Sequence, residues 1–162
     1  MARLLVKVLY MYRQQGRYRL HAFVVMPDHV HLLISVPPGV TVERAMQLVK
    51  GGFSYRAKKE LGSNMEVWQK GFSDHRIRDT SDCRIHVDYT RQNPVRKNLC
   101  EKAEDYLYSS AHAGFDLDGL PQGLKPVGLG AVGGAPEGAS FQSKSVRKAT
   151  AIASQEIERK TS

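Results

Sequence analysis

The chain has 162 residues, of which 41% are hydrophobic and 25% are charged, and this composition is typical of a globular protein with one compact domain. Its formal net charge of +8 favours binding to polyanions, with nucleic acid the first candidate and an anionic membrane the second. Cys83 and Cys100 exclude a disulfide framework and are not at metal-site spacing, so we expect reduced thiols.

The opening stretch, MARLLVKVLYMYRQQG, carries apolar side chains at helical spacing and predicts an amphipathic helix that ends near Gly16. It has no small-residue cleavage site of a secretory signal. No apolar run in the chain reaches the roughly 18 residues of a membrane span. We therefore expect a cytoplasmic protein, associated with the nucleoid, that has no membrane partner.

Residues 18–27 and 29–37 are rich in β-branched and aromatic side chains and predict two strands. The short Pro27-Asp28 break between them indicates an antiparallel hairpin. A helix is expected to start at Thr41, to be interrupted at Gly51-Gly52 and to end at Gly62.

The stretch VWQKGFSDHRIRD predicts a short strand or hairpin, and SDCRIHVDYTRQ predicts a helix that lasts until Asn93-Pro94. The order of these elements is that of an α/β sandwich with a mainly antiparallel sheet. After residue 117 the chain is rich in Gly and Pro. We therefore expect one domain over residues 1–117 and a flexible tail over residues 118–162, with room for a short terminal helix.

The most informative motif is HVH, because His29 and His31 occupy positions i and i+2 of a predicted strand. Side chains at that spacing point to the same face, while Val30 and Leu32 point to the other. Two neighbouring imidazoles are half of a divalent-metal site. Two histidines in a strand are nevertheless more often incidental.

The other half of such a site is found in the stretch RIHVDYTRQNP. Tyr89 and Asn93 are four residues apart and share one face of the predicted helix, with His86 one turn earlier. The carboxamide oxygen of Asn93 is a reasonable third ligand for a hard cation. The alternative is a half-buried tyrosine followed by an asparagine that only ends the helix before Pro94.

Four motifs now make a family resemblance specific: MPDHVHLLISV, VWQKGFSDHRIRD, HVDYTRQNPVRKNL and YLYSSAH. Over residues 18–113 the chain resembles the single-tyrosine HUH transposases, and above all the REP-associated tyrosine transposases of the IS200-like group. With the element order, the resemblance leads us to expect a ferredoxin-like or RRM-like, mainly antiparallel sheet with helices on one face.

The resemblance implies that Tyr89 is the nucleophile and that His29, His31 and Asn93 hold Mg²⁺ or Mn²⁺. It implies an endonuclease and strand-transferase acting on single-stranded DNA at hairpin or palindromic repeats, through a 5′-phosphotyrosine. Whether the protein is a monomer or a homodimer is left open. The rival reading is a catalytically inactive nucleic-acid-binding relative. A metal-dependent hydrolase is a third reading, but it needs a nearby acidic group, and Asp28 and Asp88 are expected to point away.

Basic and aromatic side chains are the candidates for DNA contact, since phosphate neutralisation and base stacking dominate binding to single strands. His86 is a further candidate for proton or phosphate contacts, whereas core packing is the expected role of Trp68 and Phe72. The candidate DNA-binding set is Lys50, Tyr55, Arg56, Lys58, Lys59, His75, Arg91, Arg96 and Lys97.

One departure from the family concerns the first strand. The family's fold has a strand before its first helix, whereas this chain begins directly at the helix. We therefore expect an N-terminally truncated domain whose sheet lacks a strand beside the one that carries the histidines. Such a gap leaves an unpaired backbone edge, which predicts marginal stability or poor solubility.

Overall fold

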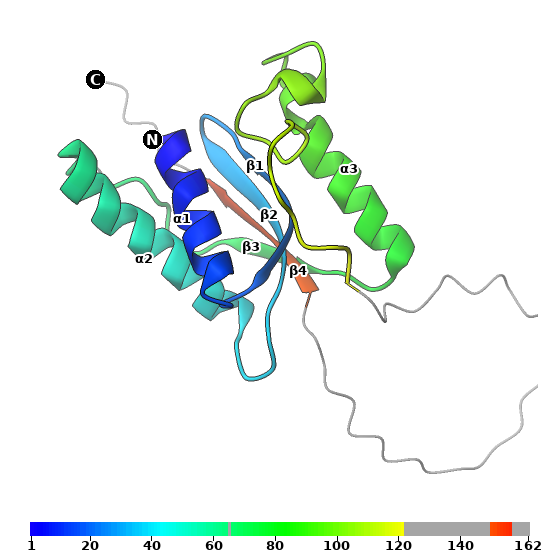
Figure 1. Ribbon diagram of the computed structural model, residues 1–162, viewed down its shortest axis with the longest axis horizontal. Helices are drawn as coiled ribbons and strands as arrows, with labels where there is room; N and C mark the ends of the chain where they lie inside the picture. The colour runs from blue at the N-terminus through cyan, green and yellow to red at the C-terminus, as the bar shows by residue number, and fades with distance from the viewer. Residues whose placement is uncertain (65, 122–149, 157–162) are drawn as a thin grey trace, which may run out of the picture.

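A four-stranded antiparallel sheet forms the centre of the fold, and helices cover both of its faces (Figure 1). The computed structural model describes residues 1–64, 66–121 and 150–156. The strand order is β1-β2-β4-β3. The strands are β1 (Arg19–Val25), β2 (His29–Ser35), β3 (Ser73–Arg76) and β4 (Thr150–Glu156). The predicted α/β class and antiparallel sheet are confirmed.

Helices α1 (Ala2–Gln14) and α2 (Val42–Leu61) lie together on one face of the sheet (Figure 1). The buried stripe of α1 packs into the main core with Val30, Leu32 and Ile34 of β2. Thr41 caps α2, because its hydroxyl accepts a hydrogen bond from the Arg44 N–H at 3.2 Å. Gly62 ends α2 in the left-handed conformation, with a φ of 63°.

The predicted interruption of α2 at Gly51-Gly52 is wrong, since the helix continues through both glycines. A Cβ atom at Gly52 would lie 2.5 Å from the Tyr12 hydroxyl oxygen of α1. The glycine therefore permits the close approach of two helices. A single sequence cannot distinguish this use of glycine from a helix break.

Helix α3 (Thr80–Arg96) packs on the opposite face of the sheet, so the expectation of helices on one face is wrong. The contact is a small second core, formed by Ala22, Leu33, Ile77, Cys83 and Val87. Asp79 caps the helix through the Asp82 N–H, and the helix runs two residues past Pro94. A single turn of 3-10 helix, η1 (Ala103–Asp105), follows. The free thiols Cys83 and Cys100 agree with prediction.

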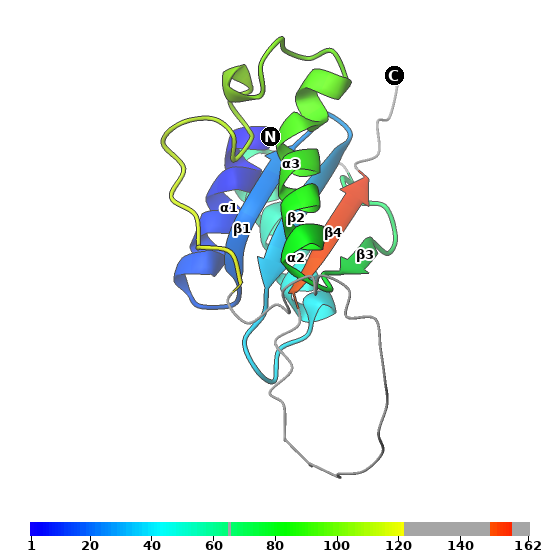
Figure 2. The ribbon, with the colours of Figure 1, turned by 90° about the vertical axis from the view of Figure 1, so that its right-hand side faces the viewer.

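The position beside β2 that the sequence left empty is occupied by β4, from the far end of the chain (Figure 2). In the register, His31 is opposite Ser154, and on the other edge of β4 His75 is opposite Ile152. The backbone groups of β2 thus have partners on both sides, as buried polar groups require. The expected open edge of β2 is therefore wrong.

The prediction of a flexible tail is wrong over residues 150–156, because they form β4. It is also wrong at residue 118, where the predicted tail begins. Asp118 accepts a hydrogen bond from the Leu20 N–H at 2.8 Å and pairs with Arg13 at 2.7 Å. The remaining tail predictions, for residues 122–149 and 157–162, lie outside the described residues. Within the described part, no helix is both long and apolar enough to cross a bilayer.

Candidate metal and nucleophile site

His29 and His31 lie side by side on the face of β2 that also carries Leu33 of the second core, which is the face that helix α3 covers. Their ring centroids are 4.7 Å apart, and the rings are nearly perpendicular. His31 is buried, with 9% of its surface exposed, whereas His29 is only partly covered. The alternation of the strand therefore places both imidazoles on one face, as the sequence predicted.

Tyr89 and Asn93 approach the histidines from α3. The Tyr89 ring centroid lies 5.6 Å from that of His31, and 42% of the tyrosine remains exposed. All four residues line one cavity of about 610 Å³. Its other walls are Asp28, Gln69, Lys70, Gly71, Phe72, Ser73 and Lys97. The structure thus brings together the four residues that the sequence selected for metal binding and nucleophilic attack.

Asp28 orients His29 through a contact of 2.6 Å between its Oδ1 and the imidazole Nδ1. In a neutral imidazole, Nδ1–H donates to the carboxylate and leaves the Nε2 lone pair for a cation. The expectation that Asp28 points away is wrong, because β2 begins at His29 and strand alternation does not extend to Asp28. Asp88 instead lines a separate cavity with Arg91 and Gln92.

Burial lowers the pKa of His31 to about 4, and the neighbouring His29 adds a smaller effect in the same direction. His31 is therefore neutral at neutral pH, which is the state that ligates metals. Asn93 is 3% exposed, and its Oδ1 has no hydrogen-bond partner among the described residues. An unsatisfied buried acceptor costs roughly 1–3 kcal/mol. A divalent cation would satisfy this oxygen, so the donor set fits one.

Three cationic side chains lie at the tyrosine or in the walls of its cavity. The Arg96 guanidinium lies over the Tyr89 ring, 5.0 Å from its centroid. Lys97 and Lys70 line the same cavity as Tyr89. Lys70 was not among the predicted DNA-binding residues, although it belongs to the VWQKGF motif that carries part of the family resemblance.

The candidate DNA-binding residues of α2 lie on the other side of the sheet from Tyr89, because α2 and α3 cover opposite faces. Arg56 pairs there with Glu60, and the Lys59 ammonium lies over the Tyr55 ring. Lys58 belongs to the same helix, and Arg91 lines the separate cavity of Asp88. The structure therefore does not bring these five residues to the cavity of Tyr89.

Lys50 has a different position from the rest of α2. Its ammonium donates to the carbonyl oxygens of Gln69 and Gly71, at 2.8 and 3.0 Å, and so fixes the loop that walls the site. The indole N–H of Trp68 donates to the Lys50 carbonyl at 3.1 Å. Trp68 is buried, and Phe72 packs against the same core, so the expected core role of both is confirmed.

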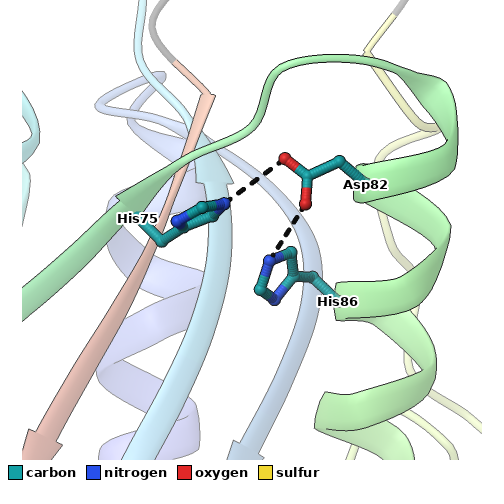
Figure 3. A group of neighbouring side chains, drawn as sticks. All are labelled: His75, Asp82 and His86. Carbon is teal, nitrogen blue, oxygen red and sulfur yellow. Dashed lines mark hydrogen bonds and ion pairs between the residues drawn. The ribbon is translucent and has the colours of Figure 1, made fainter. Parts of the chain in front are cut away.

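His75, expected to contact DNA, forms a second cluster with Asp82 and His86 (Figure 3). The Nε2 atoms of His75 and His86 lie 3.3 and 3.2 Å from the Asp82 carboxylate oxygens. Partial burial opposes ionisation of Asp82, but the Arg78 N–H and the two imidazoles hold its pKa below the usual value. The two histidines also share a cavity with His31 and Tyr89.

The family description "transposase IS200 like" matches residues 1–92, a range that includes His29, His31 and Tyr89. Two curated relatives are each 29% identical over 111 residues. The Haemophilus influenzae relative, named as a candidate REP-associated tyrosine transposase, aligns over 62% of this chain and 63% of its own length. The Escherichia coli K12 relative, a REP-associated tyrosine transposase, aligns over 68% and 61%.

A solved structure of a REP-associated tyrosine transposase bound to a REP hairpin is also similar, with a TM-score of 0.59 and 27% identity. The match covers 86% of this chain and 80% of that one. This chain therefore spans less than two thirds of the length of the curated relatives, but most of the length of the structural one.

Proposed function

The chain belongs to the IS200-like transposase family, and from this premise we propose that it cuts and rejoins single-stranded DNA through Tyr89. The single observation that carries the proposal is the buried Oδ1 of Asn93, which has no hydrogen-bond partner in the part of the chain that the structure describes. It lines one cavity with two imidazoles and an exposed tyrosine. A purely structural role for Asn93 would not offset the free-energy cost of burying this oxygen without a hydrogen bond.

His29, His31 and Asn93 are the residues that would hold the divalent ion, and we propose Mg²⁺ or Mn²⁺. Such an ion would withdraw charge from a phosphate oxygen and stabilise the negative charge that develops there. Asp28 fixes the orientation of the His29 ring, and burial keeps His31 neutral. The protein's own contribution is therefore a preorganised set of nitrogen and oxygen ligands with room left for a phosphate.

Tyr89 is the proposed nucleophile. Its hydroxyl oxygen forms a bond to phosphorus while the bond from phosphorus to the 3′ oxygen breaks. The phenol loses its proton, and the departing 3′ oxygen gains one. The products are a 5′-phosphotyrosine and a free 3′ hydroxyl. Because the phosphodiester energy is kept in the covalent bond, a second 3′ hydroxyl can reseal the strand without ATP.

The proposed substrate is a single strand that contains a hairpin or palindromic repeat. One similar structure is of a protein bound to a REP hairpin. Arg96 lies over the Tyr89 ring, and Lys70 and Lys97 line the cavity of Tyr89. We propose that these three cations neutralise phosphates near the scissile bond. Apart from Lys50, which fixes the loop that walls the site, we propose no role for the candidate residues of α2 at the cleavage step, because α2 covers the far face of the sheet.

The experiment is a covalent-trapping assay with a labelled hairpin oligonucleotide and Mn²⁺, analysed on a denaturing gel. The wild-type chain should give a shifted protein–DNA band. Tyr89→Phe, which removes one oxygen, should give none and should still fold. Tyr55→Phe, on the opposite side of the sheet, is the matched control and should keep the band. If wild type binds the hairpin but forms no covalent band, the protein is an inactive DNA-binding relative.

A further inference from the structure

A second cluster of possible metal ligands lies beside the proposed catalytic site, toward the N-terminal end of α3, and its histidines share a cavity with His31 and Tyr89. His75 comes from β3, whereas Asp82 and His86 lie one turn apart on α3 (Figure 3). We propose that His75, Asp82 and His86 form a second cation site, selective for Zn²⁺-like ions, that fastens β3 to α3.

The distances suit a tetrahedral ion. Ligands at roughly 2.0–2.2 Å from Zn²⁺ lie about 3.3–3.6 Å from one another in a tetrahedron. The observed distances from the two Nε2 atoms to the Asp82 oxygens are 3.3 and 3.2 Å. One nitrogen or oxygen from each of the three residues lies within 4.8 Å of the others. Because the two imidazoles face different Asp82 oxygens, the ligand atoms would draw together from within 4.8 Å to the tetrahedral spacing on binding an ion.

The donor types decide the class of ion. Two imidazoles and one carboxylate favour Zn²⁺ and similar transition metals over Mg²⁺, which prefers an all-oxygen shell. The cluster is also accessible, since the side chains of His75, His86 and Asp82 are 44%, 26% and 21% exposed. Three protein ligands leave the fourth tetrahedral position open for water.

The consequence of binding is mechanical. Strand β3 has only four residues, all exposed, and within the sheet it pairs with β4. At the cluster, β3 meets α3 through the contact of His75 with Asp82. An ion coordinated by residues of both elements would replace this hydrogen bond. It would also restrain the half of α3 that precedes Tyr89.

The alternative explanation is that the three side chains only form hydrogen bonds with one another. The Asp82 carboxylate faces His75, His86 and the Arg78 N–H, which donates to it at 3.0 Å. This explanation predicts no metal binding at the cluster. The two accounts therefore differ in the number of Zn²⁺-like ions that the protein takes up.

The test is a titration of the tag-free, metal-free protein with Co²⁺, followed through the visible absorption of tetrahedral cobalt and by calorimetry. Wild type should bind two ions, one at each cluster. His86→Ala and His31→Ala should each bind one, and only His86→Ala should lose the tetrahedral absorption. His112→Ala, which changes a histidine outside both clusters, should still bind two.

A stability measurement gives a second readout that does not depend on activity. In a His31→Ala background, saturating Zn²⁺ should raise the thermal midpoint, because an ion that binds only the folded state stabilises it. Adding His86→Ala should abolish that rise. A single bound ion in wild type, with the same absorption in His86→Ala, would overturn the proposal and leave the catalytic site unaffected.

Discussion

Two histidine clusters flank Tyr89, and they satisfy their polar atoms in different ways. The cluster of His29, His31 and Asn93 is mostly buried and contains an acceptor without a partner among the described residues. The cluster of His75, Asp82 and His86 is partly exposed, and both of its imidazoles lie against the carboxylate. Among the described residues, the first set leaves one buried acceptor unpaired, whereas in the second set the carboxylate accepts from both imidazoles.

This difference indicates which cluster is coupled to chemistry. A buried amide oxygen without a partner costs stability, so its position is best explained by a ligand that acts there. A self-satisfied cluster can bind an ion as an additional link without being needed for cleavage. We therefore expect the two clusters to respond differently to substitution.

The largest effect should come from breaking the strand that joins the clusters, because β4 pairs with both β2 and β3. Ile152→Pro removes a backbone N–H donor from β4 and disrupts its pairing. Each buried polar group left without a hydrogen bond costs roughly 1–3 kcal/mol of folding free energy. We expect a lower thermal midpoint and loss of both metal sites, measured by melting and Co²⁺ titration. The wild-type chain is the control, and equal melting of Ile152→Pro and wild type would contradict the pairing of β4.

The next largest effect should distinguish the two clusters by their contribution to cleavage. His31→Ala or His29→Ala should reduce cleavage of the hairpin to background, because the ion loses an imidazole ligand. DNA affinity should mostly remain, since Lys and Arg contacts to phosphate supply it. Gel-shift and cleavage assays measure both, with His86→Ala as the variant that should still cleave in Mg²⁺. Full cleavage in excess chelator would exclude a metal role.

Asn93→Ala should have a smaller effect. Two imidazoles and water can still hold an ion loosely, so we expect cleavage to fall roughly 10-fold and to recover partly at high Mn²⁺. The variant also removes a buried oxygen that has no partner among the described residues. The free energy of unfolding of the metal-free protein should therefore not fall by the amount that a lost hydrogen bond usually costs. Gln92→Ala, directly adjacent on α3, is the control for helix propensity. Cleavage that is unchanged at every Mn²⁺ concentration would remove Asn93 from the site.

The smallest effect is a pH dependence of stability. The pKa of His31 falls from 6.5 to about 4 in the folded protein, so the unfolded chain binds more protons between these values. The free energy of unfolding of the metal-free protein should therefore decrease as the pH falls from 6.5 to 4. His21, whose pKa burial also lowers, acts in the same direction. Denaturant titrations should show a shallower dependence for His31→Gln, and an unchanged slope would contradict the burial effect.

The sequence predicted the local features and missed those that depend on distant partners. The spacing of His29 with His31 and of Tyr89 with Asn93 follows from strand and helix periodicity, which is why these residues could be selected. Nothing local indicates that residues 150–156 pair with β2, because strand pairing between distant segments leaves no periodic signal. The contact of Tyr12 with Gly52 likewise becomes visible only when two helices meet.

Asp28 and Lys70 were missed for a similar reason. Asp28 lies just before β2, where strand alternation gives no direction for the side chain, and Lys70 lies in the loop before β3. Five of the residues selected for DNA contact lie on α2, and all but Lys50 are away from the site, because composition cannot tell which face of a sheet a helix covers. The layer arrangement decides this, and it puts α2 opposite the site.

The most direct test of the central claim is to identify the side chain that carries the DNA. The wild-type protein is incubated with a hairpin oligonucleotide and Mn²⁺, digested with trypsin and nuclease, and analysed by mass spectrometry. We predict a nucleotide adduct on the peptide IHVDYTR, whose only tyrosine is Tyr89, and no adduct when chelator replaces Mn²⁺. An adduct on another tyrosine, or one that forms equally in chelator, would contradict a metal-dependent nucleophile at Tyr89.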